Sequence, residues 1–126
     1  MHVLERAAKP GGNSYKASSG INGAPTQYQP LKDDAFYADT LRSAGTAMSE
    51  KTQQRERLMK TLTDESSDAI NWLTKHQGID LSAVAQLGGH SIPRTHRPGP
   101  SVKKPVGMAI VDGLSLIHIS EPTRPY

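Results

Sequence analysis

Residues 11–22 read GGNSYKASSGIN, a run that combines glycines with hydroxyl and amide side chains more densely than a hydrophobic core or a solvated loop requires. Glycine lets the backbone adopt positive φ angles and approach another group closely. The hydroxyls, amides and free N–H groups of the run can donate hydrogen bonds to oxygen-rich ligands such as phosphates. The same composition is typical of a flexible connector, so the run alone leaves a ligand-binding loop and a linker both open.

The segment just before this run favours the ligand-binding interpretation. Residues 1–7, MHVLERA, contain a short apolar stretch that is compatible with a β-strand and ends in the carboxylate of Glu5. In a nucleotide-binding βαβ unit, the second strand ends in an Asp or Glu that accepts hydrogen bonds from ribose hydroxyls, and the chain then turns toward the pyrophosphate. Glu5 is therefore the candidate ribose ligand, although without the following run it would be one more exposed acid.

A second chemically rich run lies at residues 88–98, GGHSIPRTHRP, where two histidines and two arginines fall within eight positions. Arginine presents a planar fork of donors that matches carboxylates and phosphates. A metal site is weakly supported, because His90 and His96 lack a third ligand and zinc usually takes three or four. A solvated basic loop explains the composition equally well.

Three blocks in order carry a resemblance to a known family: residues 4–14, residues 16–24 (KASSGINGA) and residues 85–97 (AQLGGHSIPRTHR). They resemble the FAD-binding segment of the fumarate reductase and succinate dehydrogenase flavoproteins, most closely the soluble, fungal-type fumarate reductases. The resemblance covers about residues 1–113. It implies an α/β fold, namely a partial Rossmann-type FAD-binding domain without its first βα unit, because no Gly-x-Gly-x-x-Gly turn occurs in the sequence. The chain itself is expected to be mostly α-helical, with loops and few short strands.

The resemblance also implies FAD as the cofactor. The residues that it places on FAD are Glu5 at the adenosine ribose, Gly12, Asn13 and Ser14 on the pyrophosphate side, and Ser18, Ser19 and Gly20 at the flavin ring or its ribityl chain. The backbone N–H near Ser19 is expected to face a substrate carboxylate as well. Related flavoproteins often carry glycine or alanine at Ser18 and Ser19, so the backbone there matters more than the hydroxyls.

In the resembled family, reduced flavin delivers a hydride to fumarate, an arginine protonates the neighbouring carbon, and Arg, His and Thr side chains hold the carboxylates. Those residues belong to segments downstream of Gly113, so no catalytic residue and no metal ligand is assigned here. The resemblance thus implies a piece, inactive alone, of an FAD-dependent oxidoreductase acting on fumarate and succinate. Another unsaturated acid or a steroid is the alternative substrate. A small basic protein that binds an anion or a nucleic acid is the alternative outside the family.

Composition narrows these choices. Only 35% of the 126 residues are hydrophobic, and the sequence carries 11 Gly and 9 Pro. So little apolar content leaves little to offset the loss of chain entropy on folding, and we expect marginal stability. The net charge of +3, without a Lys/Arg block, argues only weakly for nucleic acid, and no nucleic-acid partner is expected. The absence of cysteine excludes disulfides and thiolate metal sites. No apolar run is long enough to span a bilayer. A cytoplasmic or mitochondrial location is expected, and the oligomeric state stays open.

The sequence divides into three expected parts. Residues 1–32 form the partial FAD-binding segment, and residues 33–113 form the helical part of the FAD domain with its Gly/His/Arg loop. Residues 114–126, LSLIHISEPTRPY, resemble a translated sequencing-library adapter and are set aside as a non-native tail. The alternative for this tail is a C-terminal strand over residues 116–119.

Helices are expected mainly in the middle part. Asp33 or Asp34 could cap a helix over residues 35–45 that ends at Gly45. Ser49 could cap a second helix, whose apolar face comprises Leu58, Met59 and Leu62.

A new helix is expected to begin at Thr63 and to end at Gly78, with a packed face formed by Ala69, Ile70, Trp72 and Leu73. Shorter helices are expected over residues 81–87 and over residues 106–111, the second one being cut short by the tail.

Overall fold

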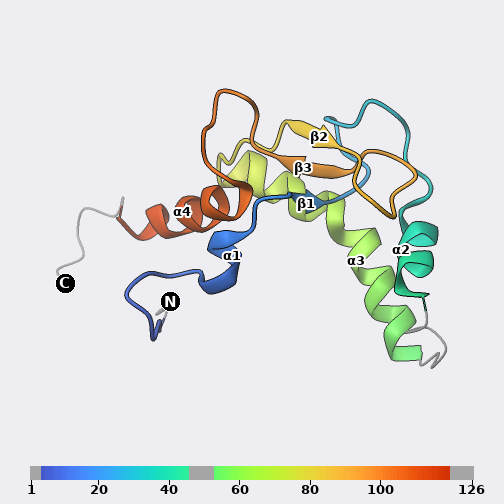
Figure 1. Cartoon of the computed structure of the whole chain (residues 1–126), viewed down its shortest axis with the longest axis horizontal. Coiled ribbons are helices and arrows are strands. Elements are labelled where there is room, and N and C mark those ends of the chain that lie inside the picture. The colour runs from blue at the N-terminus through green and yellow to red at the C-terminus, as the bar shows by residue number, and fades with distance from the viewer. Residues whose placement is uncertain (1–3, 46–52, 120–126) are drawn as a thin grey trace.

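The computed structural model describes residues 4–45 and 53–119. Figure 1 shows that helices dominate and that the strands are short, which confirms the expected fold. In chain order the elements are α1 (Gly12–Lys16), β1 (Ile21–Asn22), α2 (Phe36–Ala44), α3 (Gln53–Asn71), the π-helical turn η2 (Trp72–His76), β2 (Ala83–Ala85), β3 (Thr95–Arg97) and α4 (Val106–Ile119).

The three strands form an antiparallel sheet in the order β1-β3-β2. Ile21 lies opposite His96 on one side of β3, and Val84 lies opposite His96 on the other. The central strand β3 therefore comes from the run at residues 88–98, the second Gly-rich block. The neighbouring strand β1 comes from the run at residues 11–22, the first Gly-rich block. The sheet brings the two Gly-rich blocks side by side, although paired residues such as Ile21 and His96 lie more than seventy positions apart in the sequence (Figure 1).

Helix α3 is longer than expected. It runs without interruption from Gln53 to Asn71 and continues into η2, so the predicted helix start at Thr63 is wrong. The Thr63 hydroxyl donates to the carbonyl of Lys60 one turn earlier and does not cap a new helix. The predicted end at Gly78 is confirmed, because its φ of 68° is the left-handed geometry that follows a helix end. The predicted cap at Ser49 lies outside the described residues.

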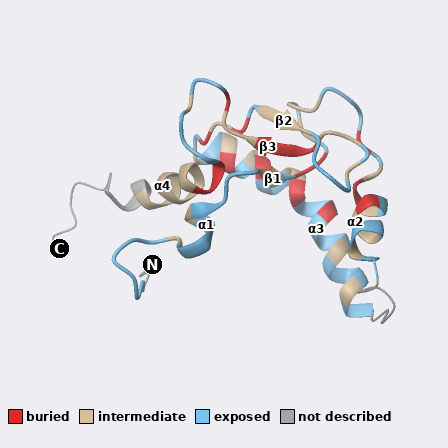
Figure 2. Cartoon of the chain, in the orientation of Figure 1, coloured by how far each residue is buried: buried red, intermediate tan, exposed pale blue. Residues whose placement is uncertain are grey.

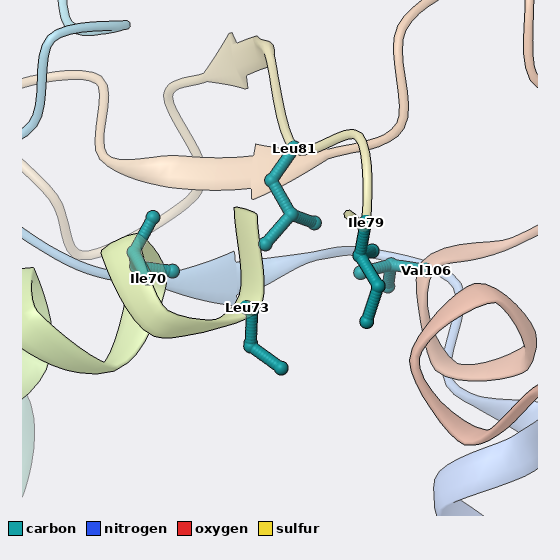
Figure 3. Close-up of a cluster of buried hydrophobic side chains, with 5 residues drawn as sticks. All are labelled: Ile70, Leu73, Ile79, Leu81 and Val106. Carbon is teal, nitrogen blue, oxygen red and sulfur yellow. The ribbon is translucent and has the colours of Figure 1, made fainter. Parts of the chain in front are cut away.

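A small apolar core joins α3, η2, the segment after it and α4. Its members, drawn in Figure 3, are Ile70, Leu73, Ile79, Leu81 and Val106. Ile70 and Leu73 were predicted to pack and do so. Glycine at position 23 lets β1 approach this core, because a Cβ there would lie 2.5 Å from Ile70 Cγ1.

The predicted apolar faces of α3 and η2 are wrong for their largest members. Leu58, Leu62 and Trp72 are 62%, 58% and 47% exposed. The buried stripe of α3 contains polar Thr63 and Ser66 in addition to Ile70 (Figure 2). Ser66 is buried because its hydroxyl donates to the carbonyl of Ala24 and accepts from the N–H of Ala24. Hydrogen bonding to the chain after β1, rather than hydrophobicity, thus selects the buried face.

The other helix predictions had mixed outcomes. Helix α2 begins at Phe36 with Ala35 at its N-cap and no side-chain cap, so the predicted cap at Asp33 or Asp34 is wrong. The Asp33 carboxylate accepts from the N–H of Ala35, before the helix, and Gly45 ends the helix as predicted. Residues 81–87 contain strand β2 instead of a helix, because pairing with β3 overrides the local preference. Helix α4 begins as predicted but runs to Ile119, so the tail does not cut it short and residues 116–119 are not a strand. Residues 120–126 lie outside the described part, and the adapter origin of residues 114–126 stays a prediction. No helix among the described residues is long and apolar enough to cross a membrane.

Candidate functional site

The first Gly-rich block is a short helix followed by an extended segment that enters the sheet. Gly11, with φ of 106°, precedes α1, and the segment after α1 leads through Gly20 into β1. Helix α4 packs against this segment, since the N–H of Gly107 donates to the carbonyl of Ala17 at 2.9 Å. A Cβ on Gly107 would collide with the carbonyl of Ser14. The backbone of the block is therefore held from one side by α4 and from the other by β3.

Several hydrogen-bonding side chains and N–H groups of this segment lie at the surface. The side chains of Asn13, Ser14, Ser18 and Ser19 are exposed and make no hydrogen bond to any described residue. The N–H groups of Ser18 and Ser19 are likewise unbonded within residues 4–45 and 53–119. A Cβ at Gly12 would meet nothing within 4 Å. The donors predicted from the sequence are thus gathered on one segment, and their chemistry suits phosphate or carbonyl oxygens.

Gly20 has a structural role in addition to its predicted contact with a cofactor. Its φ of 143° is rare for residues with a side chain, and a Cβ there would lie 2.5 Å from Thr95 Cγ2 and 2.7 Å from the carbonyl oxygen of His96. Next to it, the Thr95 hydroxyl donates to Asn22 Oδ1 at 2.7 Å. Close contact between β3 and the chain before β1 therefore requires glycine at this position.

The structure does not place Glu5 at the end of a strand, so that prediction is wrong for the described residues 4–7; residues 1–3 lie outside the described part. Glu5 is exposed just before a bend, and its Oε1 accepts from the N–H of Ala7 at 2.8 Å. In Figure 1 the segment before α1 loops away from the sheet. Within residues 4–45 and 53–119, no strand pairing aligns Glu5 with the donors of Ser18 and Ser19.

The second block is built around a fully buried arginine. Arg94 Nε and Nη2 donate to the two carboxylate oxygens of Asp33 at 2.8 and 2.9 Å, and Nη1 donates to Asp39 Oδ2 at 2.7 Å. The guanidinium carbon lies 4.8 Å from the centre of the Phe36 ring. The prediction of a solvated loop is wrong here, because Arg94, Thr95 and His96 are at most 1% exposed. Because Arg94 is completely buried and pairs with two internal carboxylates, it is not accessible to an external anion.

Hydrogen bonding fixes both carboxylates in their charged form. The N–H and hydroxyl of Ser91 donate to Asp39 and, together with Arg94, hold the pKa of that carboxyl well below its ordinary range despite burial. Burial alone would raise the pKa of Asp33, yet bonds from Arg94 and Gln29 lower it below 3.8. Arg42 also contacts Asp39, at 2.6 Å.

Both histidines of the block are held neutral. His96 Nδ1 faces the carbonyl of Arg94 at 2.8 Å, which can only accept, so Nδ1 carries the proton and Nε2 accepts from the Thr26 hydroxyl at 2.6 Å. His90 Nδ1 lies 3.1 Å from Arg94 Nη1, which can only donate, so this nitrogen is an acceptor. Burial lowers the pKa of both rings, and for His90 the charge of Arg94 lowers the pKa further. In the described part of the chain, no group of three His, Asp or Glu side chains could hold a metal ion.

The sequence interpretation missed the partners of Arg94. Asp33 was taken only as a helix cap, and Asp39 was not singled out. One signal was available: Asp39 lies three residues after Phe36 in α2, so both occupy one helical face, and both are buried. An acid on a core-facing helix position requires a buried basic partner, which the second block supplies.

Comparison with known proteins relates this arrangement to a family. No family model matches the chain. The chain is 39% identical over 97% of its length to a fumarate reductase of Schizosaccharomyces pombe, and 45% identical over 90% of its length to fumarate reductase 1 of Saccharomyces cerevisiae. It is 32% identical over 89% of its length to an NADH:fumarate oxidoreductase of Klebsiella pneumoniae. The chain spans 24%, 23% and 12% of the lengths of these relatives.

A solved structure agrees on the fold. The open conformation of a flavocytochrome c3 fumarate reductase superposes with a TM-score of 0.71 over 89% of this chain and 19% of that one, at 24% identity. This likeness confirms the predicted type of fold. The chain is therefore a homologue of one segment of the fumarate reductase flavoprotein family, about a quarter of the length of its fungal members.

Proposed function

We propose that this chain supplies the flavin-contacting segment of an FAD-dependent fumarate reductase whose substrates are fumarate and succinate. The observation that carries the proposal is the group of unbonded donors between Asn13 and Ser19, held between α4 and β3. The named relatives support it, because three proteins from separate genera that match most of the chain are fumarate-converting enzymes by name. They also favour fumarate over a steroid as the substrate.

The donor set fits FAD. Asn13 and Ser14 would serve the pyrophosphate, and Ser18 and Ser19 would serve the carbonyl oxygens of the flavin or its ribityl hydroxyls, chiefly through backbone N–H groups. The open space at Gly12 would let a phosphate approach the backbone. Bound FAD would supply the hydride chemistry. The role of this chain is to bind and orient it, and no residue of the chain is proposed to transfer a proton.

Two roles rest on the family resemblance alone. Gly20 would contact the flavin with its backbone, in addition to the packing against Thr95 that the structure shows. Glu5 would accept hydrogen bonds from the ribose after releasing the N–H of Ala7. The anion-binding alternative is not proposed, because Arg94 is completely buried and paired with two internal carboxylates.

A chimera tests the proposal. The segment of Saccharomyces cerevisiae fumarate reductase 1 that aligns with this chain would be replaced by the chain. FAD retained per protein and fumarate reduction by a reduced dye would then be measured. We expect retained FAD and measurable activity. A folded chimera without FAD would contradict the proposal.

Substitutions that introduce a single negative charge then test the proposed contacts with FAD. Asn13→Asp or Ser19→Asp places a carboxylate where FAD oxygens would lie, and we expect FAD affinity to fall at least about tenfold because like charges repel. Ser101→Asp, on an exposed turn far along the sequence, is the matched control and should leave FAD affinity unchanged. Equal affinity in all three variants would show that the segment does not face the cofactor.

A further inference from the structure

We infer that Arg94 is a positioning residue for the flavin-contacting segment. Its side chain is held by α2 and by the loop before α2. Its backbone holds the chain at β1, the strand into which Ser18 to Gly20 lead. The inference rests on the proposed function. It assigns Arg94 a role different from the external anion binding that its sequence context suggested.

The guanidinium is anchored in three directions. Asp33 binds it bidentately through Nε and Nη2, Asp39 binds Nη1, and His90 Nδ1 lies beside the same nitrogen. No buried side-chain nitrogen or oxygen among the described residues lacks a hydrogen-bond partner, so the network is closed. A lysine could not reproduce this fork, because its ammonium is a point charge without fixed geometry.

The backbone of Arg94 connects the anchored guanidinium to β1 through hydrogen bonds. Its carbonyl accepts from the N–H of Gly23 at 3.0 Å, just after β1, and also from His96 Nδ1. The next residue, Thr95, binds the Asn22 side chain and fills the space beside Gly20. A shift of Arg94 would therefore move both ends of residues 20–23, and with them the N–H groups of Ser18 and Ser19.

Net stability alone does not explain such a network. A buried ion pair often adds little compared with apolar side chains of similar volume, whereas removal of one partner is strongly destabilising. What a neutral replacement cannot reproduce is the direction in which the guanidinium holds the strand. Positioning and stability can therefore be separated by removing all the charges together.

The first experiment uses the 126-residue chain and compares Arg94→Met with the triple variant Arg94→Met, Asp33→Asn, Asp39→Asn. We expect the single variant to lose thermal stability, and the triple variant to regain most of it. In the triple variant the amides of residues 20–23 should nevertheless exchange with deuterium at least about tenfold faster than in the parent chain, because loss of the fixed guanidinium makes local opening of this segment more favourable. Arg97→Met, in the same strand, is the control and should leave this exchange unchanged. Parent-like exchange in a stable triple variant would overturn the inference.

The second experiment places the same variants in the chimera and measures FAD affinity and the visible flavin spectrum. We expect the triple variant to bind FAD at least about tenfold more weakly or with a shifted spectrum, and Arg97→Met to match the parent chimera. If the parent chimera holds no FAD, the proposed function fails, while the exchange experiment still decides whether Arg94 positions the strand. Parent-like affinity and spectrum in the triple variant would overturn the inference.

Discussion

Arg94 and Asp33 form a bidentate ion pair in which both side chains are completely buried, with Nε to Oδ2 at 2.8 Å and Nη2 to Oδ1 at 2.9 Å. Two parallel N–H···O bonds fix the relative orientation of the groups as well as their distance. The pair links the central strand of the sheet to the loop that leads into α2. In a chain with few hydrophobic residues, buried charged side chains thus hold part of the fold together.

Removing one member of this pair should be costly. Asp33→Ala leaves the buried Nε and Nη2 of Arg94 without their carboxylate partner, although Asp39 still binds Nη1. We expect the free energy of unfolding to fall by about 3 to 5 kcal/mol, or the chain not to fold. The neighbouring Asp34 is exposed and pairs only with exposed Lys32. Asp34→Ala should therefore change stability by less than about 0.5 kcal/mol in urea denaturation. Equal effects of the two substitutions would contradict the buried pair.

Stability should fall with decreasing pH in two steps. The folded-state pKa values of His90 and His96 lie below 6.5, so the unfolded chain binds more protons as the pH falls through 6.5, and stability is lost there. The pKa values of Asp33 and Asp39 lie below 3.8, so their contribution is present above that pH and is lost below it.

Thermal unfolding across this pH range checks both steps. His96→Gln should shrink the first step without abolishing it, because His90 contributes in the same direction. A flat profile between neutral pH and pH values near 4 would show that the rings are not held neutral.

Gly107 should not tolerate a side chain. Gly107→Ala places a methyl group against the carbonyl of Ser14, so α4 must move away from α1, and we expect a loss of about 1 to 3 kcal/mol. Gly88→Ala is the control, because a Cβ there meets nothing within 4 Å and its φ is ordinary. Circular dichroism melts of both variants should differ, and identical melting temperatures would mean that α4 does not pack as described.

The exposed apolar side chains of α3 should affect solubility more than stability. Leu62→Lys removes an exposed leucine, so we expect less aggregation on concentration and an almost unchanged melting temperature. Leu73→Ala, in the buried core, should cost about 2 to 5 kcal/mol. Light scattering and melting curves distinguish the two effects, and a large loss of stability in Leu62→Lys would show that this face is covered.

Much of the fold was predictable from local chemistry. Gly45 and Gly78 mark helix ends because glycine suits the backbone there, and Ile70 and Leu73 are buried at helical spacing. The Gly-rich run from residue 11 was correctly singled out as a segment with unbonded donors at the surface. Its contact with a cofactor stays a prediction.

The rest depends on contacts between distant segments. Residues 81–87 favour a helix locally but pair with β3. Ser66 is buried because Ala24 supplies its hydroxyl with both a donor and an acceptor, whereas Leu62 on the same helix is exposed. Arg94 looked like an anion ligand because its two carboxylates lie 61 and 55 residues away in the sequence. Periodicity within one segment cannot reveal such pairs.

The central claim is that the segment from Gly12 to Gly20 contacts FAD. Deuterium exchange of the chimera, with FAD bound and after its removal, tests this claim most directly. We predict that FAD slows exchange in peptides covering residues 12–20 and leaves peptides covering residues 53–62 of α3 unchanged. A chimera that holds FAD but shows equal exchange at residues 12–20 in both states would contradict the claim.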